Sequence, residues 1–134
     1  MSETRSKILI IDDDIDFVGA TKNLLQSRLY EVVTAHNKEE GWEKIKNQNP
    51  DLIILDVMMK HLNDGFTLCY ELKHNPDYKH IPVLMLTSVS EKTGFKFSPK
   101  TDGEYLEAEE YREKPIKSEE LLELVEKLLK NKGV

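Results

Sequence analysis

Acidic side chains follow two short apolar runs in this sequence. Ile8-Leu9-Ile10-Ile11 leads into Asp12-Asp13-Asp14, and Leu52-Ile53-Ile54-Leu55 leads into Asp56. Short, uninterrupted apolar runs rich in β-branched residues are typical of strands buried on both faces of a parallel sheet. If the two strands are neighbours, at least three carboxylates meet at the carboxyl edge of the sheet, where open α/β sheets bind ligands. Such a cluster repels itself unless a cation or a shared proton relieves it.

Phosphoryl transfer is the chemistry that fits such a cluster. A carboxylate is a weak nucleophile that can accept a phosphoryl group and form an acyl phosphate. The transfer requires that charge on the equatorial phosphoryl oxygens be neutralised, and a hard divalent cation such as Mg²⁺, which takes oxygen ligands, suits that task. Asp12, Asp13 and Asp56 can supply the carboxylates, whereas we expect Asp14 to cap the helix that follows it.

Alternating strand and helix signals must position these residues. We expect strands over residues 7–11, 30–35, 52–56, 81–87 and 109–112. We expect helices over about 15–28, 38–48, 66–74 and 119–132, the second capped by Asn37 with Glu40 and the last by Ser118. Gly94, Pro99 and Gly103 interrupt the segment between the last two strands, so we expect a short helical turn near 90–93 and then an irregular loop.

Helical spacing also predicts which side chains of two helices face the core. In the first helix these are Phe17, Thr21, Leu24, Leu25 and Leu29. In the last helix they are Leu121, Leu122, Val125, Leu128 and Leu129.

Size and composition favour a single soluble domain over residues 1–134, with its core in 7–129 and flexible ends at 1–6 and 131–134. The net charge of -6 argues against binding to nucleic acid. No apolar run approaches the roughly 20 residues that cross a membrane, and no signal-peptide core follows Met1. Cys69 is the single cysteine, so no internal disulfide can form, which fits a cytoplasmic location.

Five segments in this order resemble the receiver domain of two-component response regulators. They are Lys7-Ile-Leu-Ile-Ile-Asp-Asp-Asp14, Pro50-Asp-Leu-Ile-Ile-Leu-Asp56-Val-Met-Met59, Asn63-Asp-Gly65, Ile81-Pro-Val-Leu-Met-Leu-Thr-Ser88 and Tyr111-Arg-Glu-Lys-Pro-Ile116. The resemblance covers about residues 7–129. It implies a flavodoxin-like α/β fold, which is a doubly wound five-stranded parallel sheet of order 2-1-3-4-5 with helices on both faces. The fourth helix is expected to be short or irregular.

The resemblance also assigns roles around the acidic cluster. Asp56 is the expected phosphoacceptor, and a histidine kinase or a histidine phosphotransfer protein is the expected donor. Asp13 is expected to bind Mg²⁺ directly and Asp12 largely through water, with the main-chain carbonyl of Met58 as a further ligand. Lys114 is expected to pair with Asp56 and then with a phosphoryl oxygen.

Two further residues are expected to report phosphorylation. Thr87 is expected to hydrogen-bond the attached phosphoryl group and pull its loop inward. Tyr111 is then expected to follow Thr87 from an exposed to a buried position. The peptide bond between Lys114 and Pro115 is expected to be cis.

The chain also departs from the family pattern. The stretch from Thr87 to Lys114 is long, with the extra length in 91–110, and we hypothesise that residues 94–104 replace part of the fourth helix and alter partner recognition. Lys60 stands where the family frequently has proline. Met58 and Val89 are apolar at positions that gate water, so we expect slow hydrolysis of the acyl phosphate.

The same residues argue against three other functions. A phosphohydrolase of the haloacid dehalogenase type needs a second acid at the position that Met58 occupies. A flavodoxin-like cofactor site needs hydroxyls and glycines in the first loop, where Asp12, Asp13 and Asp14 would repel a phosphate. A degenerate receiver that is never phosphorylated would lack some of the expected site residues, and all are present. Docking on a target and passing phosphate along a relay both remain open for a stand-alone receiver.

Overall fold

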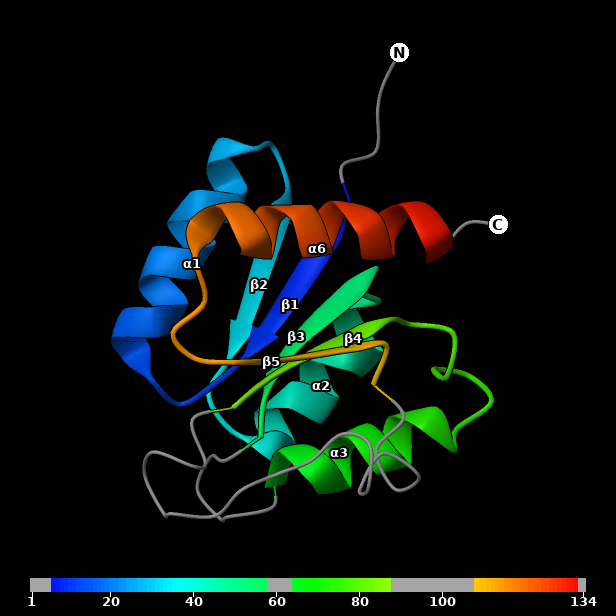
Figure 1. Ribbon diagram of the computed structural model, residues 1–134. Helices are drawn as coiled ribbons and strands as arrows, with labels where there is room; N and C mark the ends of the chain where they lie inside the picture. Colours follow the sequence, from blue (N-terminus) through cyan, green and yellow to red (C-terminus); the bar gives the residue numbers. More distant parts are fainter. Residues whose placement is uncertain (1–5, 58–63, 88–107, 133–134) are drawn as a thin grey trace.

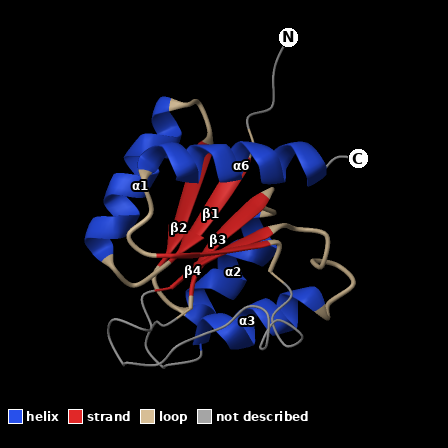
Figure 2. Ribbon diagram, in the orientation of Figure 1, coloured by secondary structure: helices blue, strands red, loops and turns tan. Residues whose placement is uncertain are grey.

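Five parallel strands form the centre of the fold, and helices cover both faces of their sheet (Figures 1 and 2). The computed structural model describes residues 6–57, 64–87 and 108–132. The strands are β1 (Lys7–Ile11), β2 (Glu31–Ala35), β3 (Leu52–Asp56), β4 (Val83–Thr87) and β5 (Glu110–Glu113). The helices in the described residues are α1 (Ile15–Ser27), α2 (Lys38–Gln48), α3 (Asp64–Lys73) and α6 (Ser118–Lys132).

The strand order is β2-β1-β3-β4-β5, and every neighbouring pair is parallel. This is the predicted flavodoxin-like order 2-1-3-4-5. The chain winds outward in opposite directions from β1 and β3, so the crevice at their carboxyl ends is the switch point where such folds bind ligands. In the register of these two strands, Ile11 lies beside Leu55. Asp12 and Asp56 therefore leave the sheet side by side.

Two apolar layers hold the sheet between its helices, because successive strand residues point to opposite faces. Leu9 and Ile11 pack in the layer under α2 and α3, with Ile45 and Leu68. The alternate residues of the same strand pack in the layer under α1 and α6. Figure 1 shows α1 and α6 on one side of the sheet and α2 and α3 on the other. All of β1 after its first residue is buried, as the continuous apolar run predicts.

The predicted buried faces of the helices need two corrections. Leu29 is wrong as a core residue, because the helix ends at Ser27 and Leu29 has a left-handed φ of 69° and a relative exposure of 67%. Val18 is buried in its helix instead. In α6 the buried residues include Leu124, whereas Leu122 is only partly buried.

Capping side chains define the starts of α1 and α2. Asp14 is the N-cap of α1, and its Oδ1 accepts a hydrogen bond of 3.2 Å from the backbone of Phe17. Asn37 caps α2 and accepts from the backbone of Glu40 at 2.7 Å, as predicted. The carboxylate of Glu40 accepts from the backbone of His36, one residue before the cap. Both caps satisfy amide groups that the first helical turn leaves without partners.

The predicted cap of the last helix is wrong by one residue. Ser118 is already part of α6, and the N–H of Leu121 donates to the carbonyl of Lys117 at 2.9 Å. Lys117 therefore occupies the cap position, and its side chain carries no acceptor for a helix amide. The predicted cis peptide between Lys114 and Pro115 is confirmed.

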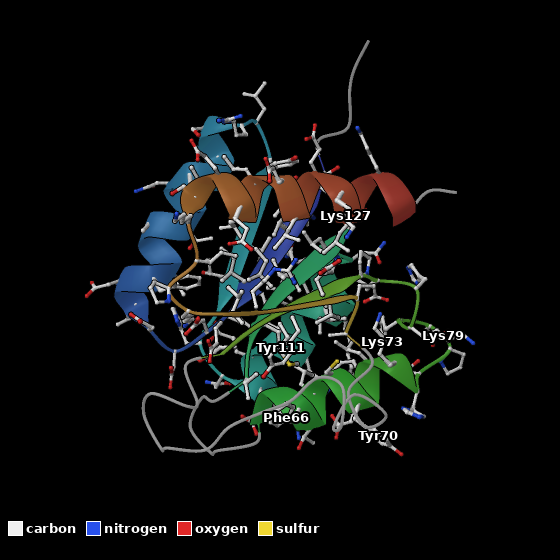
Figure 3. All side chains as sticks on the ribbon, in the orientation of Figure 1. Phe66, Tyr70, Lys73, Lys79, Tyr111 and Lys127 are labelled. Atoms are coloured by element: carbon white, nitrogen blue, oxygen red, sulfur yellow. The ribbon has the colours of Figure 1, made fainter. Side chains whose placement is uncertain are left out.

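A buried lysine joins α3 to the start of the last strand. Lys73 Nζ donates to the carbonyl of Ile81 at 2.7 Å and forms an ion pair of 2.8 Å with Glu109, while the other oxygen of Glu109 accepts from the backbone of Val83. Figure 3 labels Lys73 on α3 beside Lys79, whose carbonyl accepts a third bond of 3.2 Å. These bonds fix the residue before β5 against the amino end of β4.

Two glycines in the helices give a first prediction. A Cβ at Gly19 meets no atom within 4 Å, whereas a Cβ at Gly41 lies 2.8 Å from Cδ1 of Ile11. Gly19→Ala should raise the free energy of unfolding by about 0.5–1 kcal/mol, because alanine loses less backbone entropy on folding. Gly41→Ala should lower it, because the buried β1 side chain must shift. Urea denaturation of both variants checks this, and equal effects of the same sign would contradict it.

Some expectations fall outside the described residues. These are the flexible ends at 1–5 and 133–134, the roles of Met58, Lys60 and Val89, and the conformation of residues 90–107.

Candidate functional site

Three carboxylates converge at the carboxyl ends of β1 and β3. Asp12, Asp13 and Asp56 each place an oxygen within 4.8 Å of the others, as the two apolar runs predict. Asp12 and Asp56 are buried, with relative exposures of 1% and 3%. Asp13 is exposed and faces the cluster from the solvent side. The site is therefore a buried acidic pair with one open, acidic rim.

Asp12 is held in place by three hydrogen bonds. Its backbone N–H donates to the carbonyl of Ala35 at 3.0 Å. Its Oδ1 accepts from the backbone of Asp14 at 2.9 Å, and its Oδ2 accepts from Lys114 Nζ at 2.7 Å. The carboxylate of Asp12 is thus fixed by the turn that begins α1 and by a residue 102 positions away.

Asp56 is the least satisfied group of the cluster. Its Oδ1 is buried and has no hydrogen-bond partner among the described residues. Burial raises the pKa of Asp56 from 3.8 to about 7, and the charge of Asp12 adds to the rise while Lys114 opposes it. A carboxylate oxygen that is buried without a donor needs a cation or a proton beside it.

Lys114 supplies the positive charge of the site. Its Nζ lies 2.7 Å from Asp12 Oδ2 and 3.8 Å from Asp56 Oδ1, so the hydrogen bond is to Asp12 and the contact with Asp56 is looser. The ammonium also lies 4.3 Å from the ring centroid of Phe17. Sequence spacing gave no signal for this third contact, because residues 17 and 114 meet only through the tertiary fold.

Comparisons with known proteins agree with this arrangement. The family profile described as "Response regulator receiver domain" matches residues 8–126. The chain belongs to this family.

Similar proteins extend over most of this receiver domain. "Protein PilG" of Pseudomonas aeruginosa is 34% identical over 116 residues, which cover 87% of this chain and 82% of PilG. "Probable transcriptional regulator ycf27" of Cyanophora paradoxa is 35% identical and covers 97% of this chain and 51% of its own length. The crystal structure of the chemotaxis response regulator CheY4 of Vibrio cholerae has a TM-score of 0.79 at 31% identity, covering 93% of this chain and 99% of CheY4.

The receiver domain spans about half the length of the first curated relatives that it matches. What those whole proteins do is therefore a separate question from the chemistry of this domain. The shared part is the phosphoacceptor domain of a two-component system.

The cluster of this receiver fits a divalent cation. Receiver domains bind Mg²⁺ at an acidic cluster, and Asp12, Asp13 and Asp56 form such a group here. Carboxylate oxygens are the hard donors that Mg²⁺ prefers. The observation that supports the fit is that Oδ1 of Asp56 accepts no hydrogen bond from the described residues, because a cation would satisfy it.

The expected switch residues lie on the two strands beyond β3. Thr87 is the last residue of β4, and its Cα pairs with Glu113 of β5. Leu86, the residue before it, pairs with Asp56, so the backbone of Thr87 lies at the site, while its side chain is outside the described part. Tyr111 pairs with Met85 and packs against the core layer under α3 together with Phe66, and both are labelled in Figure 3.

Gly65 lies beside the site. The sequence predicts a turn at this position but does not show why the residue must be glycine. Its N–H donates to the carbonyl of Val57 at 2.8 Å, at the end of β3. A Cβ at this position would overlap the backbone carbonyl of Asp56 and the backbone of Val57. Glycine thus allows the start of α3 to lie directly against the backbone of Asp56.

No helix in the part of the chain that the structure describes is both long and apolar enough to span a membrane.

Proposed function

We propose that Asp56 is the residue that accepts the phosphoryl group, and that a histidine kinase or a histidine phosphotransfer protein donates it. The observation that carries this proposal is the buried Oδ1 of Asp56 in the acidic cluster, which accepts no hydrogen bond from the described residues. A structural carboxylate would be satisfied by donors, as Asp12 is. A nucleophile instead needs a free oxygen directed at its substrate.

Three carboxylates would hold the Mg²⁺ ion in this site. Asp13 would bind it directly, Asp12 largely through water, and Asp56 and the Met58 carbonyl would complete the protein ligands. The bound ion supplies neutralisation of the charge on the transferring phosphoryl group. The same positive charge favours the ionised form of Asp56, whose pKa is raised to about 7 by burial and by Asp12.

Transfer replaces one bond to phosphorus with another. The bond from phosphorus to the donor's histidine nitrogen breaks, the nitrogen keeps the electron pair, and a carboxylate oxygen of Asp56 forms the new bond. Lys114 is 3.8 Å from Asp56 Oδ1, close enough for its ammonium to contact an oxygen of the attached phosphoryl group. As a point charge with three donors, it can keep its bond to Asp12 while doing so.

Thr87 and Tyr111 would then carry the signal to a partner. Thr87 follows Leu86, whose Cα pairs with that of Asp56, so the backbone of Thr87 lies beside the site. Its hydroxyl would bond the attached phosphoryl group. Tyr111 lies on β5, which is hydrogen-bonded to the strand of Thr87. The chemistry of the chain is then limited to accepting and losing one phosphoryl group. The partner would recognise the resulting change in the surface around Thr87 and Tyr111. A cytoplasmic location fits this role and the single cysteine.

Phosphorylation by a small-molecule acyl phosphate with Mg²⁺ tests the proposal. Intact-mass spectrometry should show one added phosphoryl group on the wild type and none on Asp56→Asn. Asp14→Asn is the matched control, because it also removes one negative charge and leaves an amide that can still cap α1. Phosphorylation of Asp56→Asn to the wild-type level, or none of the wild type, would overturn the assignment.

A further inference from the structure

The aromatic ring of Phe17 contacts Lys114 and has no role in the phosphoryl transfer proposed above. Phe17 lies in the first turn of α1, where Asp14 caps the helix through the backbone N–H of Phe17 itself. The ring is partly buried and packs against the core layer under α1 and α6. Its centroid lies 4.3 Å from Lys114 Nζ, which is within the range of a favourable cation–π contact.

In the part of the chain that the structure describes, Lys114 has two acidic partners, Asp12 and Asp56. Among the described residues, its side-chain hydrogen bond is the 2.7 Å bond to Asp12, and Asp56 lies beyond hydrogen-bond distance at 3.8 Å. The side chain is only 13% exposed, so water screens it poorly. In such surroundings a contact with an aromatic face is worth more than at an open surface.

An aromatic partner suits this site for a chemical reason. The ring attracts the ammonium through its electron-rich face and takes up no N–H donor, so the donors of Lys114 stay available for a phosphoryl oxygen. A carboxylate in the same place would also hold Lys114, but it would compete for the metal and repel the incoming phosphate. The ring also continues to attract Lys114 when a cation draws the Asp12 carboxylate away.

We propose that Phe17 is a positioning residue that holds the Lys114 ammonium over the acidic cluster and so promotes phosphorylation of Asp56. The inference rests on the proposed function, because it assigns a role within the same site. Phe17 touches neither the phosphoryl group nor the metal, and it acts through Lys114 alone.

Ring fluorination separates this role from simple packing. Phenylalanine carrying one, two or three ring fluorines at position 17 keeps nearly the same shape while its face becomes steadily less attractive to a cation. The initial rate of phosphorylation by an acyl phosphate should fall stepwise across the series, by about three- to tenfold in total. Phe17→Tyr should retain most of the rate, and Phe17→Leu should resemble the most fluorinated protein.

A second readout needs neither metal nor phosphate. In the metal-free protein, NMR should show the Cε protons of Lys114 shifted upfield by the ring current of Phe17, and Phe17→Leu should remove that shift. A flat response of the rate to fluorination, or Lys114 protons without a ring-current shift, would overturn the inference about Phe17. A wild-type protein that takes up no phosphoryl group would instead overturn the proposed function, and the NMR result would still stand by itself.

Discussion

Replacing Lys114 with methionine should lower the free energy of unfolding of the metal-free protein by about 3 kcal/mol near pH 8. Two carboxylates that are almost fully buried, Asp12 and Asp56, lose in this variant the ammonium that pairs with both of them. Breaking a buried ion pair from one side leaves an uncompensated charge, which costs more than the pair contributed. Urea denaturation in the presence of a chelator measures the change, which should appear as a lower midpoint with an unchanged slope.

Lys127→Met is the matched control for this variant. Lys127 also forms a short ion pair, at 2.6 Å with Glu110, but its side chain is 55% exposed. Its loss should cost no more than about 1 kcal/mol, because solvent screens the Lys127 ammonium and Glu110 keeps its ion pair with Arg112. Equal effects of the two substitutions would contradict the view that Lys114 offsets a buried negative charge. Added Mg²⁺ should recover more stability in Lys114→Met than in the wild type, because the cation then meets no competing ammonium.

Both the stability argument and the proposed chemistry arise from the same unfavourable arrangement. A buried carboxylate with one oxygen that accepts no hydrogen bond from the described residues, next to a second buried carboxylate, costs folding free energy. A cation or an incoming phosphoryl group binds more tightly here because each removes part of this unfavourable free energy. The site therefore stabilises the protein least when it is empty of ligands.

The sequence predicts the strands and the acidic cluster because their signals lie in short, contiguous segments of the chain. An uninterrupted apolar run must be buried on both faces, so Leu52–Asp56 was predicted to the residue, and Asp56 follows from where the run ends. Parallel pairing of β1 and β3 then brings the carboxylates together without further information. The caps at Asp14 and Asn37 were equally local, since each bonds a backbone amide three residues on.

The errors in the buried faces of the helices arose where burial depends on the neighbouring elements and not on the local pattern. Leu29 continues the helical spacing of α1, but the helix ends at Ser27 and the chain turns through a left-handed residue into β2. Leu122 and Leu124 both lie near the buried face of α6, and the rotation of the helix against the sheet decides which is covered. The bond from Lys114 to Asp12 depends on the tertiary path of the whole chain.

Asp56→Asn should make the metal-free protein more stable at about pH 8, by about 3 kcal/mol, and the gain should fade toward pH 4. The folded protein holds the pKa of Asp56 at about 7, compared with 3.8 for the ordinary group. The contribution of Asp56 to stability is therefore complete below about pH 4 and is lost as the pH rises through about 7. Asparagine cannot ionise, so the variant avoids this loss, although its buried amide keeps part of the desolvation cost.

Denaturation curves in chelator from about pH 4 to about pH 8 measure the predicted divergence of Asp56→Asn from the wild type. Asp14→Asn, an equal change of charge at an exposed cap, should follow the wild type across the range. Mg²⁺ at about a hundred times its dissociation constant should raise the wild-type stability by about 2.7 kcal/mol. It should raise that of Asp56→Asn less, because the variant has lost one carboxylate ligand. If the free energy of unfolding varied with pH in the same way for the wild type and Asp56→Asn, the raised pKa could not belong to Asp56.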